Sequence, residues 1–449
     1  MSDLPVTADP GETPAGTADA TMVVDLTADA KVAAADIPPE LVAQSLGQYL
    51  RAWWLRVRSG DSGVLPVVLG IVLVAVAFQA ANSKFLSSQN LVNLFEQSTV
   101  YMVLAMAEIF ALLLAEIDLS VGLVMGLGSV VVAELVQPTG ANFPWWAAII
   151  TALLACSACG AIQGWLVARL RMPSFIVTLG GLLILEGVAI IVLGGTLVSI
   201  GNSRFTNEVV LYKIFWGHFS PVVGWILLAV LVGAAGAGFW LRDVRKRRAG
   251  LETPPPSLTA LKIVLMAAAG IALVAICNVN RAHFGTIEGV PYIIPIVLVV
   301  LAAWTVLLQR TRFGRYVYAI GGNPEAARRA GVRLASVRIW GFVLAGLTAG
   351  IAGVLFASWQ VDITTNIIKE SNSYVLLAIA AAVIGGTSLF GGRGRTIHGV
   401  LGGLVIGAIY NGLFLLGVQA QWIDVAVAGV LLAAAVVDVL SRRSASSTA

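Results

Sequence analysis

The sequence predicts an all-α polytopic membrane protein with about twelve transmembrane helices. Three observations predict it: 58% of the 449 residues are apolar, only 12% are charged, and the mean hydropathy is +0.89. Soluble domains carry about 25% charged residues. A chain this apolar needs a bilayer, whose core of about 30 Å is crossed by about 20 apolar residues in a helix. The 47 glycines suit membrane helices, which pack closely through small residues.

The first 60 residues differ from the rest of the chain. Residues 1–47 contain eight acidic residues and a single base, Lys31, among Ala, Thr and Pro. Such a segment cannot bury enough apolar surface to fold alone, so we predict a disordered acidic tail on the cytoplasmic side. Residues 48–60 combine Arg and Trp with apolar residues, a pattern typical of an amphipathic segment at the membrane interface.

Residues 61–441 contain the apolar segments and form the predicted transmembrane permease domain, followed by a cytoplasmic tail at 442–449. The twelve segments are residues 64–81, 99–116, 119–137, 145–168, 174–196, 221–241, 259–277, 292–309, 339–358, 374–389, 397–417 and 420–440. The third and the tenth are short for a span. One of them could be a broken or re-entrant element, so the predicted range is ten to twelve spans.

The distribution of Lys and Arg predicts the orientation, because these residues concentrate in cytoplasmic loops. If the N-terminus is cytoplasmic and twelve spans alternate, all but five of the 28 Lys and Arg lie inside. The five on the outer side are Lys84, Arg204, Lys213, Arg281 and Lys369. A wrong number of spans would reverse this bias farther along the chain. Both termini are therefore predicted to be cytoplasmic.

The cytoplasmic segment 310–338 contains the signals of a short helix. Asn323 is a good N-cap, Pro324 suits the first helical position, and Glu325 lies near the positive end of the helix dipole. The following residues favour helix, place positive charge at its other end and close it with glycine: Ala326, Ala327, Arg328, Arg329 and Gly331. A helix of two turns needs neighbouring spans or a partner to hold it. The pattern fits an ordinary loop helix and a docking element equally well.

Four stretches resemble, in the same order, motifs of the permease subunits of bacterial monosaccharide ABC importers, the family of ribose, galactose and xylose permeases. They are residues 116–122 (EIDLSVG), 173–181 (PSFIVTLGG), 314–332 (GRYVYAIGGNPEAARRAGV) and 384–392 (IGGTSLFGG). The resemblance covers roughly residues 85–440. It implies the type II-like ABC importer permease fold in the bacterial inner membrane. It also implies that Asn323–Gly331 is an EAA-type coupling segment on which an ATPase docks.

The resemblance further implies the partners of this chain. A separate ATPase subunit would bind ATP and magnesium, while this chain would bind no cofactor and no metal. A periplasmic or lipid-anchored binding protein would deliver the sugar, and a second copy of the permease would complete a homodimer in membrane lipid. Nothing in the sequence suggests nucleic acid as a partner.

Two details point to the xylose branch of this family. They are Ala115-Glu116 before the acidic turn, and an extra pair of spans around the basic loop 242–258. Residues 359–373, on the outer side, differ from the acidic run of relatives, which leaves the identity of the sugar open.

The motif residues also have structural interpretations. Asp118 or Ser120 could cap the third span, with Gly122 following, and Glu116 could pair with a cytoplasmic Arg; a gating role for this turn is the alternative. A glycine-rich cytoplasmic turn contains Gly385, Gly386, Gly391 and Gly392. Candidates for lining a solute path are Gln163, Gln360 and Asn411. Among the acids within spans, Glu108 lies deep, whereas Glu134, Glu186, Asp424 and Asp438 are expected toward span ends.

The sequence contains no nucleotide-binding P-loop, since no G-x-x-x-x-G-K-[ST] occurs and none of the six lysines follows a glycine. No nucleophile–base arrangement or metal-ligand cluster supports an enzyme. The energy for transport would therefore come from another subunit. Two alternatives remain: a permease of the same superfamily for another sugar, a branched-chain amino acid or a signalling furanone, and a secondary transporter coupled to an ion gradient.

Overall fold

The computed structural model describes residues 63–201, 205–251, 253, 255–282 and 285–446, together with 47, 48 and 51. The predicted acidic tail and most of the interfacial segment lie outside the described residues. The apolar helices are α4 (Leu65–Ala81), α5 (Ser88–Leu113), α6 (Val121–Leu135), α7 (Trp145–Arg169), α8 (Ser174–Leu193), α10 (Pro221–Arg248), α11 (Pro256–Cys277), α12 (Ile293–Arg310), α15 (Leu334–Gln360), α16 (Thr365–Ile384), α17 (Thr396–Leu415) and α18 (Ala420–Ser446). The shorter elements are β1 (Val198–Ser199), α9 (Thr206–Trp216), α13 (Arg312–Gly322), α14 (Pro324–Arg329) and β2 (Asp362–Ile363).

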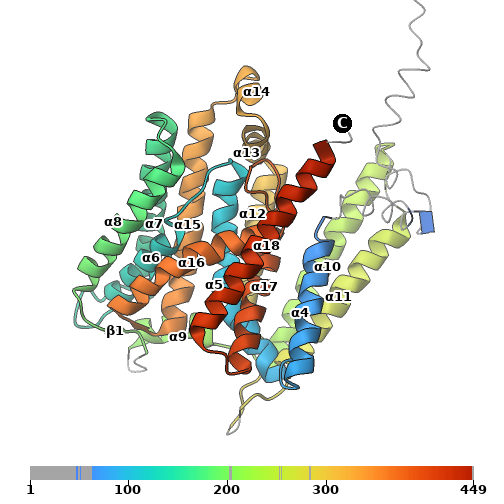
Figure 1. Cartoon of the computed structure of the whole chain (residues 1–449). Coiled ribbons are helices and arrows are strands. Elements are labelled where there is room, and N and C mark those ends of the chain that lie inside the picture. The colour runs from blue at the N-terminus through green and yellow to red at the C-terminus, as the bar shows by residue number, and fades with distance from the viewer. Residues whose placement is uncertain are drawn as a thin grey trace, which may run out of the picture.

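Each of the twelve predicted segments coincides with one apolar helix. Among the described residues, nine helices are long and apolar enough to cross a membrane, and α4, α6 and α18 have shorter apolar stretches. The all-α polytopic fold is confirmed. The bundle places α14 and the C-terminal end of α18 at one end, and α9 and β1 at the other (Figure 1). Because the basic segments lie at the end that holds α14, we identify that end as cytoplasmic.

Several predicted boundaries are wrong because capping residues lie outside the apolar runs. α5 begins at Ser88 rather than at residue 99. Ser87 caps this helix, since its hydroxyl accepts the N–H of Asn90 at 3.3 Å. α16 begins at Thr365 rather than 374, and Thr364 caps it in the same way. α18 continues through Ser446, so residues 442–446 extend a helix instead of forming a separate tail.

Three elements at the outer end, β1, β2 and α9, were not predicted. β1 pairs antiparallel with β2, with Val198 opposite Ile363. This pair ties the connection after α8 to the connection between α15 and α16. The short helix α9 packs on α15 and α7 beside it.

The centre of the bundle is built from α5 and α15, and close contacts between small residues hold it together. A Cβ on Gly160 of α7 would overlap the carbonyl of Phe342 in α15, and one on Gly346 would overlap the carbonyl of Cys156. Gly403 of α17 lies equally close to the backbone of Met102 in α5. The small-residue spacings therefore pack spans within one chain, as the sequence predicts.

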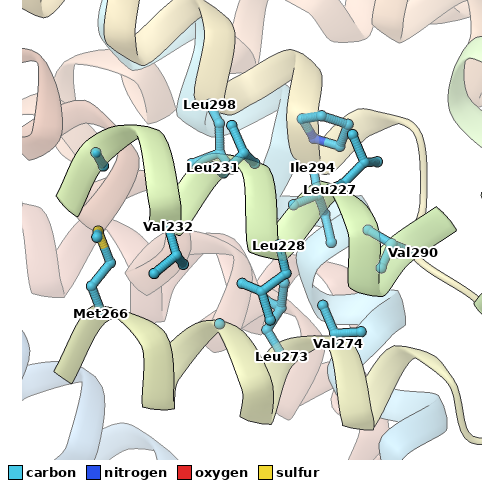
Figure 2. A pocket seen from close by; sticks show the side chains of 14 residues that line it. Leu227, Leu228, Leu231, Val232, Met266, Leu273, Val274, Val290, Ile294 and Leu298 are labelled. Carbon is cyan, nitrogen blue, oxygen red and sulfur yellow. The ribbon is translucent and has the colours of Figure 1, made fainter. Parts of the chain in front are cut away.

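The hairpin α10–α11 stands at the edge of the bundle and packs mainly on itself (Figure 1). A cavity of about 310 Å³ lies between α10, α11 and α12, and Figure 2 shows the leucines and valines that line it. Every lining residue is apolar, including Leu228, Met266 and Leu298. Such a cavity offers no hydrogen-bond partner to a polar solute, so the functional site lies elsewhere.

Candidate functional site

The short helix α14 forms at the cytoplasmic end as the sequence predicts. The Asn323 side chain accepts the N–H of Ala326 at 2.9 Å, and Pro324 is the first helical residue. Gly331 follows the helix with a φ of +82°, a conformation that favours glycine. Its N–H donates to the carbonyl of Arg328 at 3.0 Å, which closes the last turn. The prediction of a capped helix within Asn323–Gly331 is confirmed.

The exposed surface of α14 carries one carboxylate between two guanidinium groups. Glu325 accepts hydrogen bonds from Arg328 at 2.8 Å and from Arg329 at 3.3 Å. The hydrogen bond from Arg328, followed by that from Arg329, lowers the pKa of Glu325, so this carboxylate is ionised at neutral pH. All three side chains are exposed. A partner protein can reach each of them.

The rest of α14 is anchored to the bundle. Ala327 is buried in an apolar cluster with Val317 of α13, Val337 of α15 and Leu113 at the end of α5. α13 was not predicted, although most of it lies within the motif at residues 314–332. This cluster fixes α14 against the ends of two central helices.

The glycine-rich turn after α16 packs against the same place. Gly386, Gly391 and Gly392 all have positive φ values, which explains why glycine occupies them. The N–H of Gly392 donates to the carbonyl of Leu113 at 3.1 Å. A Cβ on Gly385 would overlap the carbonyl of His398, so the turn also lies close to α17.

A second predicted motif, residues 116–122, includes most of the turn (residues 114–120) that joins α5 to α6. Glu116 Oε1 lies 3.2 Å from Arg338 Nε of α15, and the two side chains are only 13% and 28% exposed. The predicted pairing of Glu116 with a cytoplasmic Arg is therefore confirmed. It connects this turn directly to the helix that follows α14.

The predicted capping of α6 is wrong. Ser120 precedes the helix, but its side chain makes no capping hydrogen bond. Asp118 instead bonds to Ser120. Its Oδ1 accepts the Ser120 N–H at 2.9 Å and the Ser120 hydroxyl at 2.6 Å. The Ser120 hydroxyl also lies 3.0 Å from Gln163 Oε1 of α7. The buried side chains satisfy one another, so none remains for the helix. Gly122 follows in the chain, and a Cβ at this position would overlap the Ser371 carbonyl of α16.

The turn enters the membrane interior. The N–H of Asp118 lies 3.4 Å from Glu108 Oε1, and Glu108 precedes the end of α5 by more than a turn. α6 therefore begins below the cytoplasmic end, and its 15 residues span only about 22 Å. The third predicted segment is thus a short but continuous helix, and a break within it stays a prediction. Glu108 is fully buried, and no group in the described chain hydrogen-bonds its Oε2.

Two further residues hold this turn and were missed by sequence reasoning. The hydroxyl of Ser174 accepts the N–H of Ile117 at 3.2 Å, and the hydroxyl of Thr178 lies 3.3 Å from the Ile117 carbonyl. Both residues belong to the motif at 173–181. Their spacing of one helical turn was the available signal, since it places both hydroxyls on one face of α8.

A cavity of about 360 Å³ lies between α14 and this turn. Its lining includes Arg328 of α14, the Glu116–Arg338 ion pair and Arg171 from the loop before α8. The two sequence motifs therefore face one cytoplasmic cavity, although they are about 200 residues apart in the chain.

The three residues proposed to line a solute path do not come together. Gln163 is buried beside Ser120. Asn411 is buried in α17 and accepts a hydrogen bond from Asn90 at 2.8 Å. Gln360 is half-buried at the outer end of α15. Their role in a path stays a prediction.

Comparison with known proteins agrees with this architecture. The family model for the permease component of branched-chain amino acid transport systems matches residues 90–436. The chain belongs to this family. It is a multi-pass inner-membrane permease subunit of an ABC transporter and not an enzyme.

Several relatives are sugar permeases. The chain is 31% identical to the xylose transport system permease protein XylH of Escherichia coli (strain K12), over 86% of this chain and 94% of that protein. It is 30% identical to the ribose import permease protein RbsC of the same strain, with 87% and 95% covered. It is also 30% identical to the D-allose transport system permease protein AlsC of that strain, with 82% and 88% covered. No solved structure matches the chain.

Proposed function

We propose that this chain forms the membrane path of an ATP-driven importer of a monosaccharide, D-xylose or a related sugar. The observation that carries the proposal is α14, a capped cytoplasmic helix that exposes Glu325, Arg328 and Arg329 in a chain without a P-loop. A permease of this kind needs a motor, and α14 offers that motor a charged, anchored contact. The names of the sugar permeases that the chain resembles support the class of substrate.

The proposed assembly has three other components. An ATPase subunit that binds ATP and magnesium docks on α14, and a sugar-binding protein docks at the outer end. Each chain has one α14, whereas a motor with two ATP sites needs two docking points. A homodimer is the simplest arrangement that supplies them.

The contacts suggest how motion of the motor reaches the membrane. Ala327 packs in one cluster with Val337, so displacement of α14 moves the start of α15. Arg338 lies in the next position of α15 and holds Glu116. A shift of α15 therefore pulls on the turn whose Asp118 positions the start of α6. In this proposal the short helix α6 is the element that switches between outward-open and inward-open states.

The docking role is tested by charge reversal in the reconstituted complex with its ATPase and binding protein. Glu325→Lys should lower both sugar-stimulated ATP hydrolysis and sugar uptake at least ten-fold, because it removes the only carboxylate of α14. Arg245→Glu is the matched control, since it reverses an exposed charge at the cytoplasmic end of α10, away from α14. Unchanged stimulation in Glu325→Lys would remove the docking role.

The substrate and the energy source are tested in the same vesicles. We compare the uptake of labelled D-xylose, D-ribose, D-allose, a branched-chain amino acid and a furanone. We expect the sugars to be taken up, and only when ATP is present. Uptake that persists without the ATPase and collapses with an uncoupler would establish ion-coupled transport instead. The buried carboxylates Glu108 and Asp118 would then be the residues to replace first.

A further inference from the structure

The outer half of α16 exposes a polar face that a lipid-facing helix would not have. Asn366, Glu370 and Ser373 are exposed and follow one another at intervals of four and three residues, so they lie on one side of the helix. Lys369 is exposed beside them. Ionisable and polar side chains in contact with lipid are costly, and they usually face a protein interior or water.

This polar face continues onto α8 within the membrane. Asn372 Nδ2 of α16 donates to Glu186 Oε2 of α8 at 3.0 Å, and both residues are half-buried. Glu186 lies about 18 Å along α8 from its cytoplasmic start at Ser174 and about 10 Å from its outer end. The expectation that Glu186 lies near a span end is therefore wrong. The contact also places Asn372 inside the membrane.

On the other side of α16, helices α17 and α18 contribute an aromatic and an acidic group. The Tyr410 hydroxyl of α17 donates to Asp424 Oδ1 of α18 at 2.9 Å, and Asp424 is exposed. The Tyr410 ring stacks on Tyr101, with 5.8 Å between ring centroids, and Tyr101 stacks on Tyr374 of α16 at 5.5 Å. α16 packs against α8 on one side and α18 on the other (Figure 1).

We infer that these groups, called here the polar band (Glu186, Glu370, Asn372, Ser373, Tyr410 and Asp424), line the route of the sugar through the outer half of the membrane. This inference rests on the proposed function. Carboxylate, amide and hydroxyl groups can exchange hydrogen bonds with every hydroxyl of a neutral sugar, so the solute loses little on leaving water. The three carboxylates of the band outnumber the neighbouring Lys369, which makes the route unfavourable for anionic solutes.

The cavity beside α10 shows what the chain places against lipid in the same half of the membrane. It is lined by apolar residues alone, among them Leu227 and Ile294 (Figure 2). The apolar lining and the polar band lie in the same half of the membrane, so depth in the membrane does not explain the difference between them. This difference distinguishes a face adapted to acyl chains from a face adapted to a hydrated solute.

Thiol labelling tests the inference in proteoliposomes that contain the whole complex. Ser373→Cys places a thiol in the polar band, and Val299→Cys places one on α12, where Val299 is 67% exposed in the outer half. A membrane-impermeant methanethiosulfonate applied outside should modify Ser373→Cys at least ten-fold faster than Val299→Cys. Excess sugar with its binding protein should slow the first reaction. The wild type gives the blank, because Cys156 and Cys277 are buried and any labelling of the half-buried Cys159 is measured there and subtracted.

Charge and transport give two independent measurements. A cationic methanethiosulfonate should react faster with Ser373→Cys than an anionic one of similar size, and Glu186→Gln should reduce that preference. Glu186→Leu should lower uptake at least ten-fold while sugar-stimulated ATP hydrolysis persists. If the face instead contacts lipid or is covered by a second copy, both thiols stay unlabelled and Glu186→Leu leaves uptake unchanged. That result overturns the inference, whereas ATP-driven uptake in the same vesicles keeps the proposed function.

Discussion

Helix α5 runs through the centre of the bundle and α10 stands at its edge, so the two occupy opposite environments. α10 has the more apolar membrane-spanning stretch of the two, but only 11% of that stretch is buried, whereas 94% of the stretch in α5 is buried. In water the more apolar helix would be the buried one. In a bilayer the lipid tails are as apolar as leucine, so burial follows from close packing and from polar contacts between helices.

The core helix α15 and the edge helix α10 differ in how closely their glycines are packed, and substituting these glycines is expected to have the largest effect. A side chain at Gly346, in the core helix α15, would overlap the Cys156 carbonyl, while Gly233 of α10 has open space around it. Gly346→Leu should therefore abolish the folded protein, because two backbones must separate. Gly233→Leu should leave it intact. The yield of monodisperse protein in detergent measures both, and equal yields would contradict the packing argument.

A smaller effect is expected from removing an aromatic ring. Phe110 of α5 is fully buried and packs edge-on against Trp304, with 5.5 Å between ring centroids. Phe110→Ala should cost about 3 kcal/mol, since the rigid surroundings cannot close the cavity. Phe239→Ala, at a 40% exposed position of α10, removes the same ring where lipid can fill the space. Thermal unfolding in nanodiscs should show a large decrease in Tm for the first variant and little change for the second.

The smallest effect on the remaining fold is expected from removing the α10–α11 hairpin itself. Its two ends meet, since the N–H of Phe219 donates to the carbonyl of Val290 at 2.9 Å and His218 pairs with Pro291. A short Gly-Ser linker can therefore replace residues 220–289. Because two spans are removed together, α12 keeps its orientation. We expect the shortened chain to insert and to keep Glu325 accessible from the cytoplasm; a reversed orientation or loss of insertion would show that the hairpin belongs to the core.

Much of the fold follows from signals that act over a few residues. Apolar length predicts each of the twelve apolar helices, and the bias of Lys and Arg predicts which end is cytoplasmic. α14 could be predicted almost to the residue because its cap, its first proline and its closing glycine are contiguous in the sequence. The ion pair of Glu116 could be anticipated because a charge at the end of a span needs a partner.

What only the tertiary structure decided are the contacts between distant segments. Asp118 bonds back to Ser120 instead of capping α6, because Glu108, Gln163 and Thr178 surround the turn and exclude water. Glu186 meets Asn372 across 186 residues of chain, and this contact marks the polar band. Hydropathy cannot predict such pairs, because lipid and protein interior are equally apolar. The sequence by itself determined how many apolar helices form and how they are oriented, while packing determined which of their faces meet lipid and which meet each other.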